Sequence, residues 1–459
     1  LKLSKKYKNI FKINENIKRN EGPQISEGQK LWNRAKNIIP GGTMLFSKNP
    51  DLTLPKKWPA YYSKAKGCEI WDLEKNKYLD MSFMGVGTNV LGYANNNIDK
   101  KIIKSIKKSN MSTLNNKYEI LLAEKLIQIH PWAKMARFTR TGGEANAVAI
   151  RIARAYTKKN NIAVCGYHGW HDWYLSSNLN NKKNLDSLLL KNLKTLGIPK
   201  NLKGTVHPFI YNNFNQLKNL IKKHDIGIIK MEVARNMRPK NNFLKKVRQL
   251  ADKKNIVLIF DECTSGFRGR LGGLHLDYKI YPDMTIFGKA IGNGYAINAI
   301  IGKEHIMRAA EETFISSTFW TEKIGVVAAL STIEEMERIK SWKKINSVGK
   351  KIRKKWNALA KKHKIKIVIQ GLNSLLSFHI NSKNWLKYKT YISQELLKHK
   401  ILASNVFYPC ISHNDQKLKL YFDALDKTIK NIALCEKKKL NIDNLLEQPV
   451  CQSGFGRLN

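Results

Sequence analysis

Two side chains at the ends of apolar runs could act together on one ligand, as an acid and an amine. Asp261 closes the run IVLIF, and Lys289 follows the run MTIF and Gly288. An isolated acid at such a place is by default a surface carboxylate, but a lysine among glycines after a buried run is harder to explain as a solvated charge. If the two runs are neighbouring strands, both groups face one cleft.

A third feature is the segment Thr141, Gly142, Gly143 and Glu144, which leads into a predicted helix over 144–157. Two glycines at a helix start expose unpaired N–H groups and let an anion approach closely, and the helix dipole adds a favourable potential. The segment could therefore seat a phosphate. Two glycines before a helix are also typical of a simple turn.

A fourth feature is Tyr167, His168 and Gly169, at the end of the run IAVCG. An aromatic ring at the end of a strand can stack on a flat heterocycle, and the glycine leaves room for it. His168 and His171 have the spacing H-x-x-H, but no third ligand recurs nearby and no HExxH is present. We therefore predict no metal site.

These four features together meet the needs of one cofactor, pyridoxal phosphate. It requires a lysine for a Schiff base, an acid that keeps the pyridine nitrogen protonated, and a seat for its phosphate. Each feature alone is weak, but the set is difficult to assemble by chance.

The elements that would position these residues follow an alternating pattern. Between about residues 115 and 300, helical spacing over 119–129 and 144–157 alternates with the apolar runs IAVCGY, IGIIKMEV, IVLIFDE and MTIFGKA. The pattern predicts an α/β fold with a mostly parallel sheet flanked by helices, in which ligands sit at the carboxyl ends of the strands.

The remaining segments predict a smaller second domain. We expect a basic N-terminal arm over 1–30, the N-terminal part of a small α+β domain over 31–85 with a hairpin in WDLEKNKYLDM, a large domain over 86–335, and the C-terminal part of the small domain over 336–459. The chain has 459 residues, of which 42% are apolar, so it can bury a sizeable core.

The chain carries 82 Lys and Arg against 35 Asp and Glu, a formal charge of +47. The lysines are spread through nearly every segment together with Asn and Ile, which favours a codon bias; a basic nucleic-acid-binding protein is the remote alternative. The six cysteines form no CxxC, so neither a zinc site nor a disulfide framework is indicated. No leader or membrane-spanning run is evident, and we expect a cytoplasmic protein.

At this point the chain resembles the class III, fold-type I, pyridoxal-phosphate aminotransferases. Within that class it is most similar to the branch that contains glutamate-1-semialdehyde aminomutase. The resemblance spans most of residues 30 to 430, in the family's order, and lies in the stretches RFTRTGGEANAVAIRIARAYT, GYHGWHDWY, MEVARN, IFDECTSGFR, IFGKAIGNGY and SSTFWTEKIG.

The resemblance implies a role for each matching residue. Lys289 would carry the cofactor as a Schiff base and shuttle protons, and Asp261 would pair with the pyridinium nitrogen. The other residues implied at the cofactor are Thr141, Gly142, Gly143, Tyr167, His168, Glu232 and Asn236, with Asn236 at the ring hydroxyl. Thr318 matches a threonine that reaches the phosphate of the neighbouring subunit, which implies a homodimer with shared active sites.

The resemblance also implies a function. We expect a ping-pong transaminase that takes an amino group from a small-molecule donor and gives it to a carbonyl acceptor. The alternative is an intramolecular aminomutase, which uses the same cofactor residues. The segment ILASNVFYPCISHNDQ lacks an acid expected of such a mutase. Arg140, Arg235 and Arg268 could each meet a substrate carboxylate or form an ordinary ion pair.

The sequence departs from the family's pattern at three positions near these motifs. Gly143 stands where a hydroxyl residue is usual, so backbone amides would hold more of the phosphate. Val233 replaces the proline of a Glu-Pro pair, and Asn293 interrupts a glycine run after the lysine. None of these changes removes a chemical role.

Overall fold

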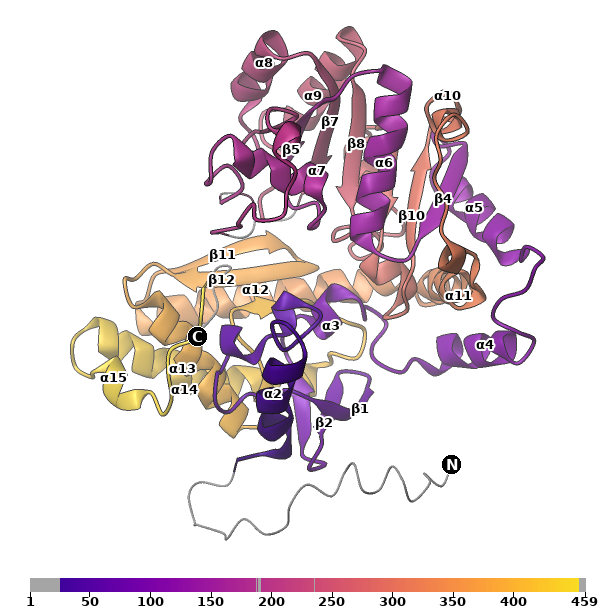
Figure 1. Ribbon diagram of the computed structural model, residues 1–459. Coiled ribbons are helices and arrows are strands. Elements are labelled where there is room, and N and C mark those ends of the chain that lie inside the picture. Colours follow the sequence, from indigo (N-terminus) through magenta and orange to yellow (C-terminus); the bar gives the residue numbers. More distant parts are fainter. Residues whose placement is uncertain (1–24, 187, 189–190, 235, 454–459) are drawn as a thin grey trace.

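The structure is a computed structural model, and it describes residues 25–186, 188, 191–234 and 236–453. Figure 1 shows two groups of elements, with a large sheet and its helices in the upper part and two small sheets with long helices in the lower part. This arrangement confirms the α/β fold expected from the alternating pattern.

A seven-stranded sheet forms the upper part, in the order β4-β10-β9-β8-β7-β5-β6. β10 runs antiparallel to β4 and β9, and the pairs β9-β8, β8-β7, β7-β5 and β5-β6 are parallel. The strands span β4 (Met135–Thr139), β5 (Asn161–Cys165), β6 (Val206–Pro208), β7 (Ile226–Glu232), β8 (Val257–Glu262), β9 (Met284–Phe287) and β10 (Asn298–Gly302).

Helices cover both faces of this sheet. α6 packs Ala145, Val148 and Ile152 against apolar side chains of the central strands, and α8 and α9 pack on the opposite face. A further layer of α4, α5 and α11 lies against the end of the sheet that holds β10. These helices span α4 (Asn96–Ile106), α5 (Tyr118–Ile129), α6 (Gly142–Thr157), α8 (Phe214–Lys223), α9 (Phe243–Lys253) and α11 (Lys323–Ile339).

The lower part draws on both ends of the described chain. β13 pairs in parallel with β3, so a C-terminal strand completes an N-terminal sheet. The sheets are β1 (Tyr62–Lys66), β2 (Glu69–Asp72), β3 (Lys77–Asp80) and β13 (Ile401–Leu402), and β11 (Ile367–Leu372), β12 (Leu375–Ile380) and β14 (Val406–Phe407). The long helices are α12 (Ser341–His363), α13 (Trp385–Lys398) and α14 (Asp415–Glu436).

Short helices complete the fold. They are α2 (Glu27–Ile38), α3 (Met84–Gly87), α7 (Asp172–Leu175), α10 (Glu304–Met307) and α15 (Ile442–Leu445), with short 3-10 turns that include η6 (Lys289–Gly292) and η8 (Thr318–Thr321). The expected arm lies outside the described residues as far as residue 24, and α2 begins within its last part. The domain limits stay a prediction. Within the described ranges, no helix is long and apolar enough to cross a bilayer.

Candidate active site

Three neighbouring parallel strands bring an acid and an amine to one edge of the large sheet. Asp261 in β8 lies opposite Glu232 in β7 on one side and opposite Ile286 in β9 on the other. Lys289 comes two residues after Phe287, the last residue of β9. The expectation that the runs carrying Asp261 and Lys289 are adjacent strands is therefore confirmed.

The carboxylate of Asp261 is held on both oxygens. Its Oδ2 accepts a hydrogen bond from His168 Nδ1 at 2.9 Å and lies 3.8 Å from Lys230 Nζ. Its Oδ1 accepts from the Cys263 N–H at 3.1 Å. Burial by itself raises the pKa of Asp261, but the Lys230 charge and these hydrogen bonds outweigh it and hold the pKa well below its usual value. Asp261 is therefore ionised at neutral pH.

The adjacent acid, Glu262, is fully engaged elsewhere. Its Oε1 contacts His275 Nδ1 at 2.6 Å, and its Oε2 accepts from the Ser265 hydroxyl at 2.9 Å and from the Leu274 N–H at 2.6 Å. Burial raises the pKa of Glu262, but the hydrogen bonds from His275 and its neighbours bring the pKa below its usual value. Of the two acids that end β8, only Asp261 lies beside the other candidate residues.

Lys289 is half-buried and its backbone is in the left-handed region, with φ 47°. Its Nζ donates a hydrogen bond to Thr264 Oγ1 at 2.8 Å. A Cβ at the preceding Gly288 would overlap Asn298, 3.0 Å from its Cγ and nearer still to its Oδ1. The glycine is therefore required by a close approach, which fixes the path of the chain into Lys289.

The amine and the acid belong to one electrostatic environment. Burial raises the pKa of the Cys263 thiol, Asp261 raises it further, and Lys289 and Lys230 act in the opposite direction. Charges on both sides therefore reach the same sulfur atom. Asp261 and Lys289 therefore both act on the Cys263 thiol, at the ends of the adjacent strands β8 and β9.

The first turn of α6 has the features of an anion seat. Thr141 caps the helix through a capping box, in which its Oγ1 accepts from the Glu144 N–H at 3.3 Å and Glu144 Oε2 accepts from the Thr141 N–H at 2.8 Å. The N–H groups of Gly142 and Gly143 follow at the start of the helix, where no intrahelical acceptor exists for them. The dipole of this 16-residue helix adds a positive potential there.

The glycine at 143 has a steric reason. A Cβ at Gly143 would lie 2.5 Å from His171 Cε1 and 2.7 Å from His171 Nδ1. That Nδ1 is buried and has no hydrogen-bond partner among the described residues, and burial lowers the pKa of His171. His171 therefore occupies the space that a hydroxyl side chain would take at 143, and it aims an unpaired ring nitrogen at the helix start.

The loop after β5 carries the aromatic candidates. The Tyr167 N–H donates to Glu232 Oε2 at 3.3 Å, which ties this loop to the end of β7. Gly166 has φ 114°, and a Cβ there would lie 2.6 Å from the Glu232 carboxylate. His168 is buried and contacts Asp261. The structure thus brings Tyr167, His168 and Glu232 around Asp261.

Two further sequence candidates are exposed and make their described hydrogen bonds to other parts of the chain. Asn236 is exposed, and its carbonyl accepts from the Gly371 N–H at 3.0 Å, at the junction of the two parts of the molecule. Thr318 is exposed at the start of η8. Within the described ranges, no hydrogen bond or ion pair joins either residue to Asp261.

The arginine candidates are occupied by internal contacts where the structure describes them. Arg140 Nε lies 2.9 Å from Glu322 Oε1, and its guanidinium also donates to backbone carbonyls. Arg268 is 1% exposed and donates to the Thr264 carbonyl. Both support the fold. Arg235 lies outside the described residues.

Sequence reasoning missed Lys230, Thr264 and Asn298. Lys230 carried a signal, since it is the one charged side chain inside the run IGIIKMEV before its terminal glutamate. Thr264 and Asn298 carried none, because a threonine shortly after a strand and an asparagine at the start of one are common in any fold. Only the folded chain brings them to Lys289 and Gly288.

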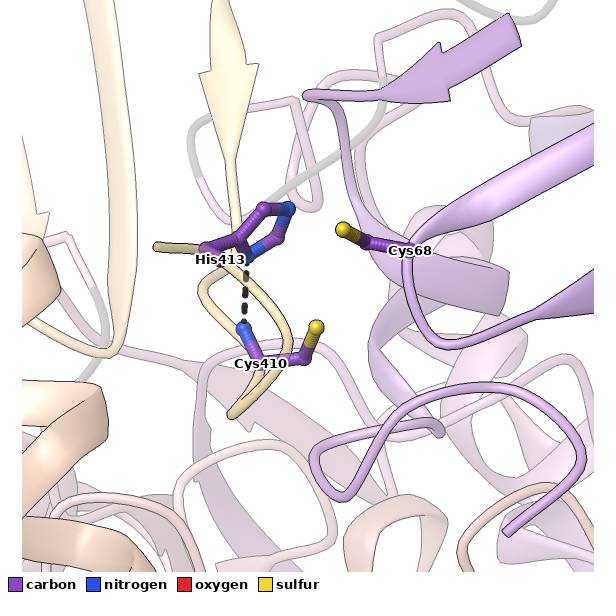
Figure 2. Close-up of side chains that lie close together, drawn as sticks. All are labelled: Cys68, Cys410 and His413. Atoms are coloured by element: carbon purple, nitrogen blue, oxygen red, sulfur yellow. Dashed lines mark hydrogen bonds between the residues drawn. The ribbon is translucent and has the colours of Figure 1, made fainter. Parts of the chain in front are cut away.

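A second group of possible ligand atoms lies in the lower part of the molecule. Cys68, Cys410 and His413, here called the thiol–imidazole cluster, are buried and offer ligand atoms within 4.8 Å of one another (Figure 2). His413 Nδ1 accepts from the Cys410 N–H at 3.0 Å, and its Nε2 contacts the Asp80 carbonyl at 2.9 Å. Lys417 Nζ lies 3.3 Å from Cys68 Sγ. Both ring nitrogens of His413 have hydrogen-bond partners, and the Lys417 ammonium lies beside the Cys68 thiol. The cluster is therefore interpreted as a hydrogen-bonded contact between distant segments.

Comparisons with known proteins agree with this geometry. The profile of the family described as aminotransferase class-III matches residues 54–406. The chain is 31% identical over 424 residues to the 3-aminobutyryl-CoA aminotransferase of Cloacimonas acidaminovorans, covering 89% of this chain and 98% of that protein. It is 30% identical over 431 residues to the glutamate-1-semialdehyde 2,1-aminomutase of Saccharolobus islandicus, with the same coverage.

Solved structures share the fold at lower identity. The FumI protein of Sphingopyxis sp. MTA144, in a form that carries pyridoxal phosphate, has a TM-score of 0.81 and 22% identity over 92% of this chain and 100% of its own. An omega-transaminase from Sphaerobacter thermophilus has a TM-score of 0.79 and 22% identity over 90% of this chain and 99% of its own.

Proposed function

The chain belongs to the class III aminotransferases, which use pyridoxal phosphate and have the fold-type I architecture, and we propose that it is a transaminase with two separate half-reactions. In the first, an amino donor leaves its amino group on the enzyme; in the second, a carbonyl acceptor takes it. The observation that carries this proposal is the placement of the ionised Asp261 and the Lys289 amine at the ends of the adjacent strands β8 and β9.

The residues present fit the cofactor. The site offers an amine held by one hydroxyl, a buried ionised carboxylate, and a helix start with an unpaired imidazole nitrogen aimed at it. When bound, pyridoxal phosphate supplies an aldehyde that condenses with amines and a ring that withdraws electrons from the substrate carbon. The site therefore has a group for each part of the cofactor: the amine for its aldehyde, the carboxylate for its ring nitrogen, and the helix start for its phosphate.

Lys289 is the proposed catalytic residue. Its Nζ would carry the cofactor between turnovers and, once displaced, would move a proton to and from the substrate carbon. Thr264 Oγ1 accepts from this Nζ at 2.8 Å, so it would hold the amine in place when it is free. The left-handed backbone at Lys289 and the close approach at Gly288 limit how far the amine can move.

Asp261 is the proposed partner of the ring nitrogen. Because its carboxylate is ionised, it would stabilise a proton on that nitrogen. His168 would orient the carboxylate through its 2.9 Å contact, and Tyr167 would stack on the ring. Glu232 would position the Tyr167 loop through the backbone N–H that it accepts. Asn236 stays a proposed contact to the ring hydroxyl.

The first turn of α6 is the proposed phosphate seat. The N–H groups of Gly142 and Gly143 and the cap residue Thr141 would hold the anion with the help of the helix dipole. Because Gly143 brings no hydroxyl, His171 Nδ1 is the side-chain group nearest to this position. The neutral tautomer of His171 that carries its proton on Nδ1 would replace the missing hydroxyl donor.

The second candidate function is an intramolecular aminomutase, favoured by the 30% identity to glutamate-1-semialdehyde aminomutases. The two are separated by whether one substrate suffices. We would incubate the cofactor-loaded enzyme with single amino donors and measure the oxo product released per subunit. A transaminase releases one equivalent and stops until a carbonyl acceptor is added, whereas a mutase converts its semialdehyde alone.

Two variants make this experiment specific. Lys289→Ala should release no oxo product, whereas Lys158→Ala removes an exposed lysine at the end of α6 and should behave as the wild type. Steady turnover of the semialdehyde with no second amino compound would replace the transaminase assignment by the mutase. Normal turnover by Lys289→Ala would reject both.

We also propose a homodimer with shared active sites. Thr318 is exposed beside Phe319, which is 68% exposed, and Phe314 in the same segment is 84% exposed. Large apolar side chains that are this exposed are typical of residues that a partner chain covers. Light scattering on the purified protein should give twice the mass of the chain, and a monomer that retains full activity would contradict the shared site.

We propose the cytoplasm as the compartment of this protein, consistent with six free cysteines.

A further inference from the structure

Lys230 is a wholly buried lysine beside the proposed catalytic acid. It lies in β7, and its side chain is 0% exposed. Its Nζ lies 3.8 Å from Asp261 Oδ2 and has no hydrogen-bond partner among the described residues. A buried ammonium without hydrogen bonds is rare, because removing it from water is costly.

Stability does not explain this side chain. Lys230 pairs along the sheet with Val164 in β5 and with Ile259 in β8, and Ile228, two residues earlier on the same face, is also 0% exposed. Burial lowers the pKa of Lys230, which shows that the site disfavours the charge. An apolar side chain of the same length would fill the space at less cost. The property that an apolar side chain would not supply here is a positive charge 3.8 Å from Asp261.

The Lys230 charge acts on a carboxylate that is held by several contacts. The groups that act on Lys230 are Asp261 and Cys263 at the end of β8 and Glu232 on its own strand. Asp261 in turn is held by Lys230, by His168 Nδ1 and by the Cys263 N–H. Contacts from the loop after β5, from β7 and from β8 thus converge on one carboxylate and fix both its orientation and its charge.

We propose that Lys230 is a positioning residue, the buried counter-ion that holds Asp261 ionised and oriented and thereby sets the proton affinity of the ring that Asp261 contacts. The inference rests on the proposed function, since it assigns Asp261 to the cofactor ring. A positive charge behind the carboxylate weakens its attraction for a further proton or cation. Removing the charge should therefore increase the proton affinity of the bound cofactor.

The first experiment tests the ion pair without cofactor. Asp261→Asn leaves the ammonium buried without a counter-ion, so we expect this variant to have the lowest urea midpoint of the set. The double variant with Lys230→Met should unfold at a higher urea concentration than Asp261→Asn alone. Ile228→Met is the matched packing control, and in the Asp261→Asn background it should give no such recovery.

The pH dependence of the apoprotein's stability is an independent test of the buried lysine. Because the pKa of Lys230 is lower in the folded state than in the unfolded state, the unfolded chain holds more protons between the two values. The wild type should therefore gain stability relative to Lys230→Met as the pH rises towards the ordinary lysine pKa. A difference between the two proteins that is constant with pH would show that Lys230 does not titrate as a buried lysine.

The second experiment reads the cofactor by its colour. We would load each variant with pyridoxal phosphate and follow its visible absorbance against pH. Lys230→Met and the neutral variant Lys230→Gln should shift the midpoint upward by about half a pH unit or more, the size expected of a lost charge a few ångströms away. Lys230→Arg, which keeps the charge, and Ile228→Met should leave the midpoint at the wild-type value.

The outcomes separate the two claims. If the wild type takes up no cofactor and shows no visible band, the proposed function fails, whatever the urea experiments give. If the wild type is coloured but Lys230→Met and Lys230→Gln titrate as Ile228→Met does, the positioning role is overturned and the function stands. A midpoint that moves downward in both neutral variants would also overturn it.

Discussion

Gly288 makes the closest approach at the candidate site, and replacing it with alanine should disturb the site directly. A Cβ at 288 would lie 3.0 Å from Asn298 Cγ and 3.3 Å from Cys263 Sγ, whereas ordinary contacts begin near 3.4 Å. Asn298 cannot turn away freely, because it is 5% exposed and its Nδ2 donates to the Arg140 carbonyl at 3.0 Å. Overpacking costs about 1–3 kcal/mol and a lost hydrogen bond about 1 kcal/mol, so Gly288→Ala should lose about 2–4 kcal/mol.

The assay is the urea midpoint of the apoprotein, followed by cofactor uptake. Gly142→Ala is the matched control, since its Cβ would lie 3.6 Å from Cys263 Sγ and 3.7 Å from Asn298 Oδ1, which are ordinary contacts. We expect the control to change stability by less than about 1 kcal/mol. Adding Asn298→Ala to Gly288→Ala should remove most of the steric cost, so the two losses should not add. A Gly288→Ala protein as stable as the control would refute the reasoning.

Three further perturbations test other parts of the structure. Burial lowers the pKa of His130 to about 4, below its unfolded value near 6.5. Its contribution to stability should therefore fall by about 3 kcal/mol as the pH drops from 6.5 through 4. If the loss of urea midpoint at acid pH were the same in His130→Gln as in the wild type, this prediction would be contradicted. Gly143→Ser should lower the free energy of unfolding by only about 1 kcal/mol, since the tip of the His171 ring can shift. Adding His171→Ala should abolish that loss in the same urea unfolding experiments. Dialysis against EDTA should leave the melting temperature unchanged, because the thiol–imidazole cluster is satisfied by hydrogen bonds; a loss of stability that Zn²⁺ restores would refute that interpretation.

Two candidate residues could be found from short sequence patterns alone. Asp261 and Lys289 could be found because each closes an apolar run, and parallel strands bring such residues to one edge. The proposed phosphate seat rests on two glycines at a predicted helix start, and α6 does begin at Gly142. The assignment of roles to these residues depended on the family resemblance, since spacing alone leaves a carboxylate and an amine without a ligand.

Features made by distant segments were not predictable in this way. The antiparallel direction of β10 and its place between β4 and β9 depend on pairing, which local periodicity does not encode. The thiol–imidazole cluster brings Cys68 close to Cys410, which comes 342 residues later in the chain (410 − 68), so no spacing rule could reveal it. The proposed role of Lys230 depends on the 3.8 Å approach of its Nζ to Asp261 Oδ2 from the neighbouring strand, and that approach appears only in the folded sheet.

The most direct test of the account is to locate the lysine that carries the cofactor. Reducing the loaded enzyme with sodium borohydride fixes the cofactor to its amine, and peptide mass spectrometry then identifies the modified residue. We expect one label per chain, on the peptide that contains Lys289, and none after Lys289→Ala. A label on Lys230 or on any other lysine, or no label on a coloured protein, would contradict the assignment of the site.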